Sequence, residues 1–225
     1  MARIEIVDVT DEARFGQVPP CADPAFDHRT CDYWEDADRG SKTSRPSWLP
    51  VGAGSDSSSS NPFAPPPKAS ANPFAPRRPD RPRIASEAPR KLQLLGRGLG
   101  IFGSYAKVLV VDGEAVAYCQ FGPLSAYPRA LRTRELYPKL PDAPLPAVIS
   151  CIATTPAARA DGYALRLVAE VCADLAGRGF AAVEAYPEAR AVANATPAAG
   201  PRFWLRAGFV LAVDDERYPV MRKEL

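Results

Sequence analysis

Residues 147–186 have the pattern of a strand, a helix and a second strand, and this order limits the folds open to the chain. Residues 147–154 and 180–186 are apolar runs of strand length, the second interrupted only by Glu184. A helix that links two such strands returns the chain to the same end of the sheet, so the strands run parallel. The helical segment, residues 164–177, places its apolar side chains on one face: Leu165, Val168, Val171, Cys172 and Leu175.

Antiparallel strands are predicted on both sides of this unit. Residues 106–111 and 115–121 are apolar runs joined by Asp112-Gly113-Glu114, and Asp-Gly between such runs indicates a hairpin. Further along, the pattern favours a short helix at 203–207 followed by strands at 209–213 and 220–225. We therefore expect an α/β fold of the α+β type, with a mixed, mostly antiparallel sheet and one central parallel strand pair flanked by helices.

Two segments give weaker signals. Residues 91–102 have helical apolar spacing, but Gly96, Gly98 and Gly100 weaken the pattern. Residues 123–146 contain six prolines and no clear period, which predicts a long surface loop.

Residues 41–90 contain eleven prolines and ten serines, a composition typical of a disordered insertion. Within them, Asn61-Pro-Phe-Ala-Pro recurs at Asn72, either as a docking motif or as a solvated spacer. Residues 1–40 cannot form a core alone, and residues 3–9 alternate like a strand. We expect residues 1–40 to pack onto residues 91–225 within one domain.

Composition excludes some classes of partner. The net charge of +2 gives no field that favours nucleic acid or an anionic membrane, and no apolar run is long enough to span a bilayer. Five cysteines without close pairing favour reduced thiols over a disulfide framework. We expect a cytoplasmic protein.

The turn between the strand at 147–154 and the helix that follows is the strongest candidate binding site. First-turn amides of a helix have no intrahelical partners, and Gly162 allows an anion to approach the backbone closely. Arg159 adds a positive charge, so the turn fits a pyrophosphate. The alternative is a helix start that needs a glycine only for packing.

This turn carries the pattern Arg159-x-x-Gly162-x-Ala164, and Phe203-Trp-Leu-Arg-Ala-Gly-Phe209 and Tyr218-Pro-Val-Met-Arg-Lys-Glu-Leu225 follow it. Residues 106–225 thereby resemble the GNAT superfamily of acetyl-CoA-dependent N-acyltransferases, whose signature is Q/R-x-x-G-x-G/A. The Cys-Asp-Tyr-Trp-Glu segment at 31–35 and the run at 178–185 resemble an uncharacterised actinobacterial branch, in which a cysteine stands where this chain has His28.

The resemblance implies an acyl-CoA N-acyltransferase fold with acetyl-CoA as co-substrate. It implies that the backbone of Ile152, Ala153 and Thr154 pairs with the pantetheine arm. The pyrophosphate would be held by the turn formed by Arg159, Ala160, Asp161, Gly162, Tyr163 and Ala164. Two residues depart from the family pattern: Asp161 adds a negative charge to the turn, and Trp204 replaces a tyrosine that often protonates the leaving thiolate.

The implied reaction is attack of a neutral amine on the thioester carbonyl, which needs a base and an acid. Glu184 is the candidate base, because its carboxylate interrupts an apolar strand, but it could equally pair with an arginine or face solvent. Tyr186 and Tyr218 are candidate acids, or ordinary core and rim residues. The acceptor side is assigned to Tyr33, Trp34, Glu35, Tyr127 and Arg129.

The remaining chemistry-bearing residues have no assigned role. Cys151 lies near the thioester path, but a base partner for acyl-cysteine chemistry is not evident in the sequence, so a structural thiol is the alternative. Cys21, His28 and Cys31 are metal-ligand types whose spacing matches no common site, and we assign no metal.

We expect an N-acyltransferase that acts on a primary amine of a small molecule or a protein, and a homodimer is compatible with such sheets. The alternative is a CoA-binding regulatory or scaffold protein that docks a partner through residues 61–78, with Trp204 marking lost catalysis.

Overall fold

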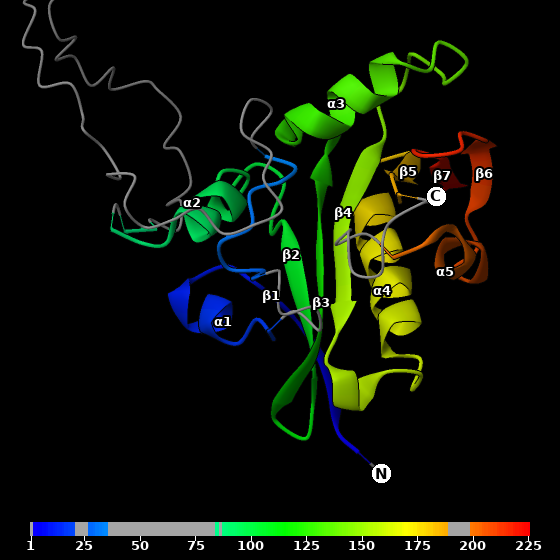
Figure 1. The fold of residues 1–225 in the computed structure, drawn as a ribbon. Coiled ribbons are helices and arrows are strands. Elements are labelled where there is room, and N and C mark those ends of the chain that lie inside the picture. The colour runs from blue at the N-terminus through cyan, green and yellow to red at the C-terminus, as the bar shows by residue number, and fades with distance from the viewer. Residues whose placement is uncertain (1, 21–26, 36–83, 86, 189–198) are drawn as a thin grey trace, which may run out of the picture.

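The computed structural model describes residues 2–20, 27–35, 84–85, 87–188 and 199–225. Cys21 and the two Asn-Pro-Phe repeats lie outside these residues. A seven-stranded sheet has the order β1-β2-β3-β4-β5-β7-β6, in which only β4 and β5 pair in parallel (Figure 1). The predicted mixed, mostly antiparallel sheet is thus confirmed. The strands are β1 Ile4–Asp8, β2 Ala106–Val111, β3 Glu114–Pro123, β4 Ala147–Thr154, β5 Ala182–Ala185, β6 Val210–Val213 and β7 Val220–Glu224.

The helices lie on both faces of the sheet, with α1 and α2 on one side and α4 and α5 on the other (Figure 1). Residues 2–8 contribute the edge strand β1, which pairs with β2. The helices are α1 Glu12–Gly16, α2 Arg90–Gly96, α3 Pro128–Glu135, α4 Tyr163–Gly177 and α5 Pro201–Arg206, with 3-10 turns at η1 Leu124–Ala126 and η2 Pro156–Ala158.

The hairpin between β2 and β3 forms as predicted. Asp112 and Gly113 have φ angles of 50° and 91°, the conformation that a tight two-residue turn requires. The Asp112 carboxylate accepts a hydrogen bond from the Arg3 amide at 2.7 Å, so the turn also fastens the start of β1.

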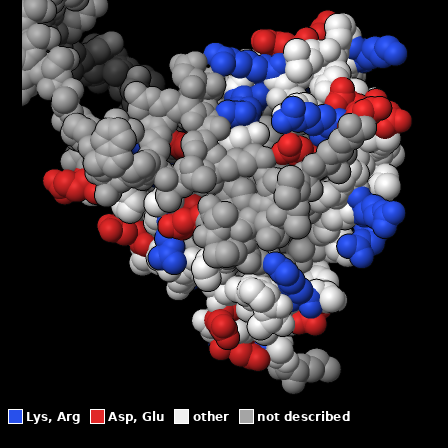
Figure 2. Space-filling model, viewed as in Figure 1, with Lys and Arg blue, Asp and Glu red and all other residues white. Residues whose placement is uncertain are grey.

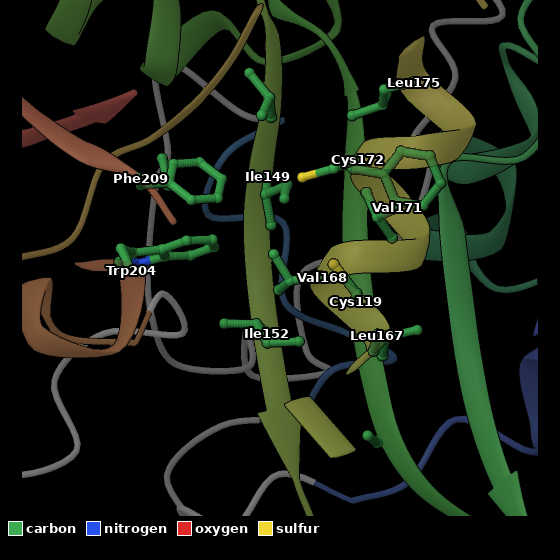
Figure 3. Close-up of a cluster of buried hydrophobic side chains, with 14 of the residues drawn as sticks. Cys119, Ile149, Ile152, Leu167, Val168, Val171, Cys172, Leu175, Trp204 and Phe209 are labelled. Carbon is green, nitrogen blue, oxygen red and sulfur yellow. The ribbon is translucent and has the colours of Figure 1, made fainter. Parts of the chain in front are cut away.

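The main core lies between α4 and the sheet. Ile149 and Ile152 of β4 stand between the α4 side chains and Trp204 and Phe209 (Figure 3). The predicted apolar face of α4 is correct except at one position: Leu165 is half-buried, and Leu167 is fully buried in its place. Ala164, Leu167, Val168 and Val171 share the helical face that meets the core, and Leu165 lies off this face.

A second core covers the opposite face. Phe15 of α1 and Leu92 and Leu95 of α2 pack against Tyr118 and Cys151. The helix predicted at 91–102 ends earlier, at Gly96, because the glycine-rich stretch continues as turns. Residues far apart in the sequence therefore share one layer beside β3 and β4.

The loop predicted at 123–146 was wrong in part. The segment contains η1 and the two-turn helix α3, whose first residue is Pro128. Proline suits the first helical position because the amide that it lacks has no partner there. Tyr127 and Ala130 are buried with Val148 and Val220, so this segment covers one end of the sheet.

The described residues on the face seen in Figure 2 carry charges of both signs. Among the described residues no helix is long and apolar enough to cross a membrane. Cys119, Cys151 and Cys172 are buried free thiols, as their place in apolar patterns predicted, and Cys31 is a half-buried free thiol.

Candidate functional site

The turn that opens α4 presents backbone amides to solvent. Ala160 and Gly162 have φ angles of 72° and 83°, and Gly162 is the N-cap of the fifteen-residue helix α4. No side chain caps this end, and residues 159–162 are exposed. A Cβ at Gly162 would meet nothing within 4 Å, so glycine is required by the φ angle alone. The amides of this turn are thus open to solvent, with the Asp161 carboxylate beside them in sequence.

Strands β4 and β5 separate soon after they meet. Only Ala147 and Val148 of β4 pair with β5, opposite Val183 and Glu184. On the other edge of β4, Gln120 pairs with Cys151 and Phe121 with Ile149, so Ser150 is the extra residue of a bulge that bends the strand.

Beyond Val148, no described residue of β5 pairs with β4. Ile152, Ala153 and Thr154 pair with β3 on one edge, and their other edge pairs with no described strand. This unpaired edge belongs to the end of β4 from which the chain continues into η2 and α4 (Figure 1). An extended ligand chain could add to β4 there as a further strand.

Five of the residues that the sequence assigned to the acceptor side or to catalysis line one cavity of about 180 Å³. We call it the aromatic pocket. Its lining residues are Tyr33, Trp34, Arg129, Thr133, Leu136, Tyr186, Glu188 and Tyr218. Glu188 and Thr133 could not be identified from the sequence, because the first lies after β5 and the second on the unpredicted helix α3.

Helix α3 and residues 27–35 hold one wall of the aromatic pocket together. The Arg129 guanidinium lies 4.0 Å from the Tyr33 ring centroid, and its Nε donates to the Tyr33 carbonyl at 2.8 Å. Trp34 packs near Tyr186, with ring centroids 6.2 Å apart. The wall is therefore aromatic with one fixed cation.

Glu184 lies behind this pocket in a buried charge network. Its carboxylate is fully buried and accepts hydrogen bonds from Arg222 Nη1 at 2.7 Å and from Tyr186 Oη at 2.5 Å. Arg134 Nε lies 3.2 Å from Glu184 Oε2. Of the readings left open for Glu184, pairing with arginine is the one observed. Both carboxylate oxygens are therefore engaged by neighbouring side chains within the buried network.

The two candidate acids differ. The Tyr186 hydroxyl is committed to Glu184, and burial followed by the charge of Glu184 raises the pKa of Tyr186 well above its usual value. Tyr218 is half-buried, and its hydroxyl makes no hydrogen bond to any described residue. The loop before β7 is fixed by backbone contacts, because the Asp215 carboxylate accepts from the amides of Arg217 and Tyr218.

Glu35 and Tyr127 line a different cavity, of about 250 Å³, on the α2 side of the sheet. Tyr127 donates to the Phe121 carbonyl at 2.7 Å, and burial, followed by the charge of Glu35, raises the pKa of Tyr127 well above its usual value. The predicted acceptor-side residues thus fall into two cavities. Glu35 and Gln120 are shared between this α2 cavity and a smaller chamber.

The smaller chamber brings together residues that the sequence left without a role. His28, Cys31 and Cys151 all line it, and His28 Nδ1 lies 3.6 Å from Cys151 Sγ. The described residues contain no cluster suited to a metal ion. Because His28 and Cys151 are 123 residues apart, no local pattern could reveal their contact.

Trp204 is fully buried and donates from Nε1 to the Ala199 carbonyl at 2.9 Å. The indole packs edge-on against Phe203 and Phe209, so its place is in the core.

No family model matches the chain, and no curated protein matches it. Among solved structures, a GNAT-family protein from Desulfovibrio desulfuricans is similar over 53% of this chain and 67% of its own, at 20% identity and a TM-score of 0.38. N-acetylglutamate synthase from Neisseria gonorrhoeae, solved with coenzyme A and N-acetylglutamate, is similar over 54% of this chain at 18% identity and a TM-score of 0.37, and the match spans only 26% of that enzyme.

The PaiA N-acetyltransferase from Thermoplasma acidophilum, solved with coenzyme A, is similar over 53% of this chain and 60% of its own, at 11% identity and a TM-score of 0.37. Each likeness covers about half of this chain.

Proposed function

We propose that the chain is an N-acyltransferase that uses an acyl-CoA, most simply acetyl-CoA, to acylate a primary amine. The observation that carries the proposal is the early separation of β4 from β5 at the end of the sheet where α4 begins. A parallel pair that ends after two residues leaves strand-pairing groups open, directly beside a helix N-terminus that is free to bind an anion.

The donor binds along this unpaired edge of β4. The pantetheine amides pair with Ile152, Ala153 and Thr154 as a further strand would. The pyrophosphate sits on the amides of residues 159–164, where the helix dipole contributes about 0.3–1 kcal/mol per charge. Arg159 strengthens the contact and Asp161 weakens it.

The acceptor amine binds in the aromatic pocket. A cavity of about 180 Å³ with aromatic walls suits a small amine or the end of a lysine side chain. Glu188 is the carboxylate that lines it, and we assign it to bind the ammonium group and to take its proton. Tyr218 protonates the leaving thiolate, since its hydroxyl has no competing partner among the described residues.

We assign Glu184 an indirect role, in which it positions neighbouring side chains. It holds Tyr186, Arg134 and Arg222 in place behind the pocket. It is a positioning residue, and the base assignment made from sequence passes to Glu188.

Turnover of acetyl-CoA by the full chain across a panel of primary amines tests the proposal, with release of free CoA as the readout. Arg159→Ala weakens donor binding, whereas Arg206→Ala, an exposed arginine on α5, leaves it unchanged. Tight CoA binding with no turnover on any amine would favour the scaffold function. No binding of any CoA ester would overturn both.

A further inference from the structure

The chamber on the α2 side of β4 is built from four separate segments. Residues 27–35, α2, β3 and β4 each contribute to its wall, which consists of His28, Cys31, Trp34, Glu35, Lys91, Gln120 and Cys151. We call it the thiol chamber. No step of the proposed acyl transfer to an amine uses it, although it concentrates a thiol, an imidazole and a carboxylate.

Cys151 and His28 form a close pair in this chamber. Their side chains are 5% and 3% exposed, and 3.6 Å between Cys151 Sγ and His28 Nδ1 is within reach of a hydrogen bond to sulfur. The Tyr118 ring, 5.2 Å away between centroids, supports the imidazole. Thiol and imidazole in contact are the two parts of a nucleophile and base.

The imidazole of His28 is neutral near pH 7. Burial and, to a smaller extent, the charge of Lys91 lower its pKa to about 4, and the charge of Asp27 opposes the shift. A neutral ring has one nitrogen with a free lone pair. The tautomer that carries its proton on Nε2 turns the Nδ1 lone pair toward Cys151, so Nδ1 can accept the thiol proton.

The chamber also holds polar atoms that no described group satisfies. His28 Nε2, Trp34 Nε1 and Glu35 Oε2 are all buried without a hydrogen-bond partner. Buried polar groups in folded proteins nearly always have partners. In the tautomer above, His28 and Trp34 present two N–H donors, which suits a carbonyl oxygen that gains negative charge.

The thiol chamber is next to the proposed donor site in the sequence of β4. Cys151 directly precedes Ile152, where pairing with the pantetheine arm is proposed to begin. The chamber shares Glu35 and Gln120 with the α2 cavity, so the two spaces adjoin. The chamber itself holds only about 10 Å³, so an acyl group on Cys151 would extend toward the adjoining cavity of about 250 Å³.

We propose that Cys151, with His28 as its proton acceptor, is a nucleophilic site that takes an acyl group from a thioester. The thiol gives its proton to His28 Nδ1, and its sulfur bonds to the thioester carbonyl carbon. The bond from that carbon to the CoA sulfur breaks, and the proton passes from His28 to the CoA thiolate. The products are free CoA and an S-acyl cysteine, and no oxidant or metal is required.

The acyl source rests on the proposed function, so the test uses two donors. The full chain is incubated without amine, once with acetyl-CoA and once with p-nitrophenyl acetate, which needs no CoA site. Peptide mass spectrometry is expected to find one acetyl group on Cys151, removable by hydroxylamine. The buried thiols of Cys119 and Cys172 serve as internal controls and stay unmodified.

Variants separate chemistry from folding. His28→Asn is expected to slow acetylation of Cys151 about a hundredfold, the lower range for loss of a general base. Cys151→Ser abolishes the thioester, whereas Cys172→Ser leaves it intact. Circular dichroism checks that each variant is folded.

Two outcomes would overturn the proposal. One is an unmodified Cys151 with both donors. The other is acetylation of Cys151 by p-nitrophenyl acetate at the same rate in the folded His28→Asn variant. Amine-dependent release of CoA with Cys151 unmodified would support the N-acyltransferase and contradict the thiol site. Acetylation of Cys151 by p-nitrophenyl acetate in a protein that binds no CoA would contradict the N-acyltransferase function and support the thiol site.

Discussion

Tyr186 and Tyr218 both line the aromatic pocket, but only Tyr218 has a hydroxyl that a substrate can use. We expect Tyr218→Phe to lower kcat about a hundredfold with little change in KM, because a general acid acts on the leaving group and not in binding. Steady-state kinetics with acetyl-CoA and a reactive amine measure the separate effects on kcat and KM.

Tyr137→Phe is the matched control for this substitution. The Tyr137 hydroxyl donates to the Tyr218 carbonyl at 3.0 Å, so its loss perturbs the same loop without removing the acid. Equal losses of kcat in the two variants would mean that catalysis depends on the position of this loop and not on the Tyr218 hydroxyl as an acid.

Glu184 is expected to matter for stability. In Glu184→Gln the buried guanidinium of Arg134 loses its partner carboxylate and Arg222 keeps only Glu224, and breaking a buried pair costs about 3 kcal/mol or more of unfolding free energy. Urea denaturation measures this loss. Glu170→Gln, an exposed carboxylate on α4, changes stability by less than about 0.5 kcal/mol. A stable Glu184→Gln protein with a shifted pH–rate profile would instead restore Glu184 as the base.

His28 makes the fold sensitive to acid. Its pKa falls from 6.5 to about 4 on folding, so the unfolded chain binds more protons between these values. The contribution of neutral His28 to the unfolding free energy is fully present above pH 6.5. It decreases by about 3 kcal/mol as the pH falls toward 4. We expect His28→Asn to flatten the curve of unfolding free energy against pH in this window.

A second titrating group lies outside that window. Burial alone would raise the pKa of Asp174, but hydrogen bonds from Arg178 and Lys107 outweigh burial and lower it from 3.8. Its contribution is lost only at more acidic pH, in wild type and in His28→Asn alike. An unchanged slope between pH 6.5 and 4 in His28→Asn would contradict the assignment to His28.

At the scale of elements, the first turn of α4 depends on one backbone angle. Gly162→Ala is expected to cost about 1–2 kcal/mol of stability, because alanine is strained at a φ of 83°. The change should also weaken CoA binding, measured by calorimetry, since the proposed anion site is this turn.

Gly177→Ala, at the other end of α4, is the matched control. Gly177 is exposed and has helical backbone geometry, so alanine there is neutral or slightly stabilising. If the two variants bind CoA equally well, the turn at Gly162 is not the phosphate site.

Elements defined by local periodicity could be predicted from the sequence. The strands at 106–111 and 147–154 and the hairpin at Asp112-Gly113 follow from apolar runs and turn residues. Helix α3 could not be predicted, because it has only eight residues and its stability comes from Tyr127 and Ala130 packing against distant strands. Tertiary burial decides the conformation of so short a segment.

The candidate sites likewise differ in whether they could be predicted from local sequence. The α4 turn is a local pattern and was visible in the sequence. The network around Glu184 joins α3, β5 and β7, and the thiol chamber joins four segments. Such contacts depend on topology, which spacing along the chain does not encode.

At the scale of the whole molecule, Glu35 and Lys91 form an ion pair, so the described residues on the two sides of 41–90 meet. We expect that replacing residues 41–80 with about ten Gly and Ser residues, a span of roughly 15–20 Å, leaves the melting temperature nearly unchanged. A large drop would mean that this segment is part of the folded domain.

The same protein tests the repeats. CoA release by the shortened chain at the wild-type rate would separate the acyltransferase from any docking role of residues 61–78. Loss of turnover together with an unchanged melting temperature would assign this segment a part in the reaction.

The two-residue contact between β4 and β5 also divides the molecule mechanically. Strands β1 to β4 form one antiparallel block and β5 to β7 another, with α4 packed across the junction. The two chain ends belong to different blocks, so tension applied to them acts across the weakest line in the sheet. Forced unfolding should therefore begin by parting the blocks at low force, and a molecule bound to both should raise the force at which they part.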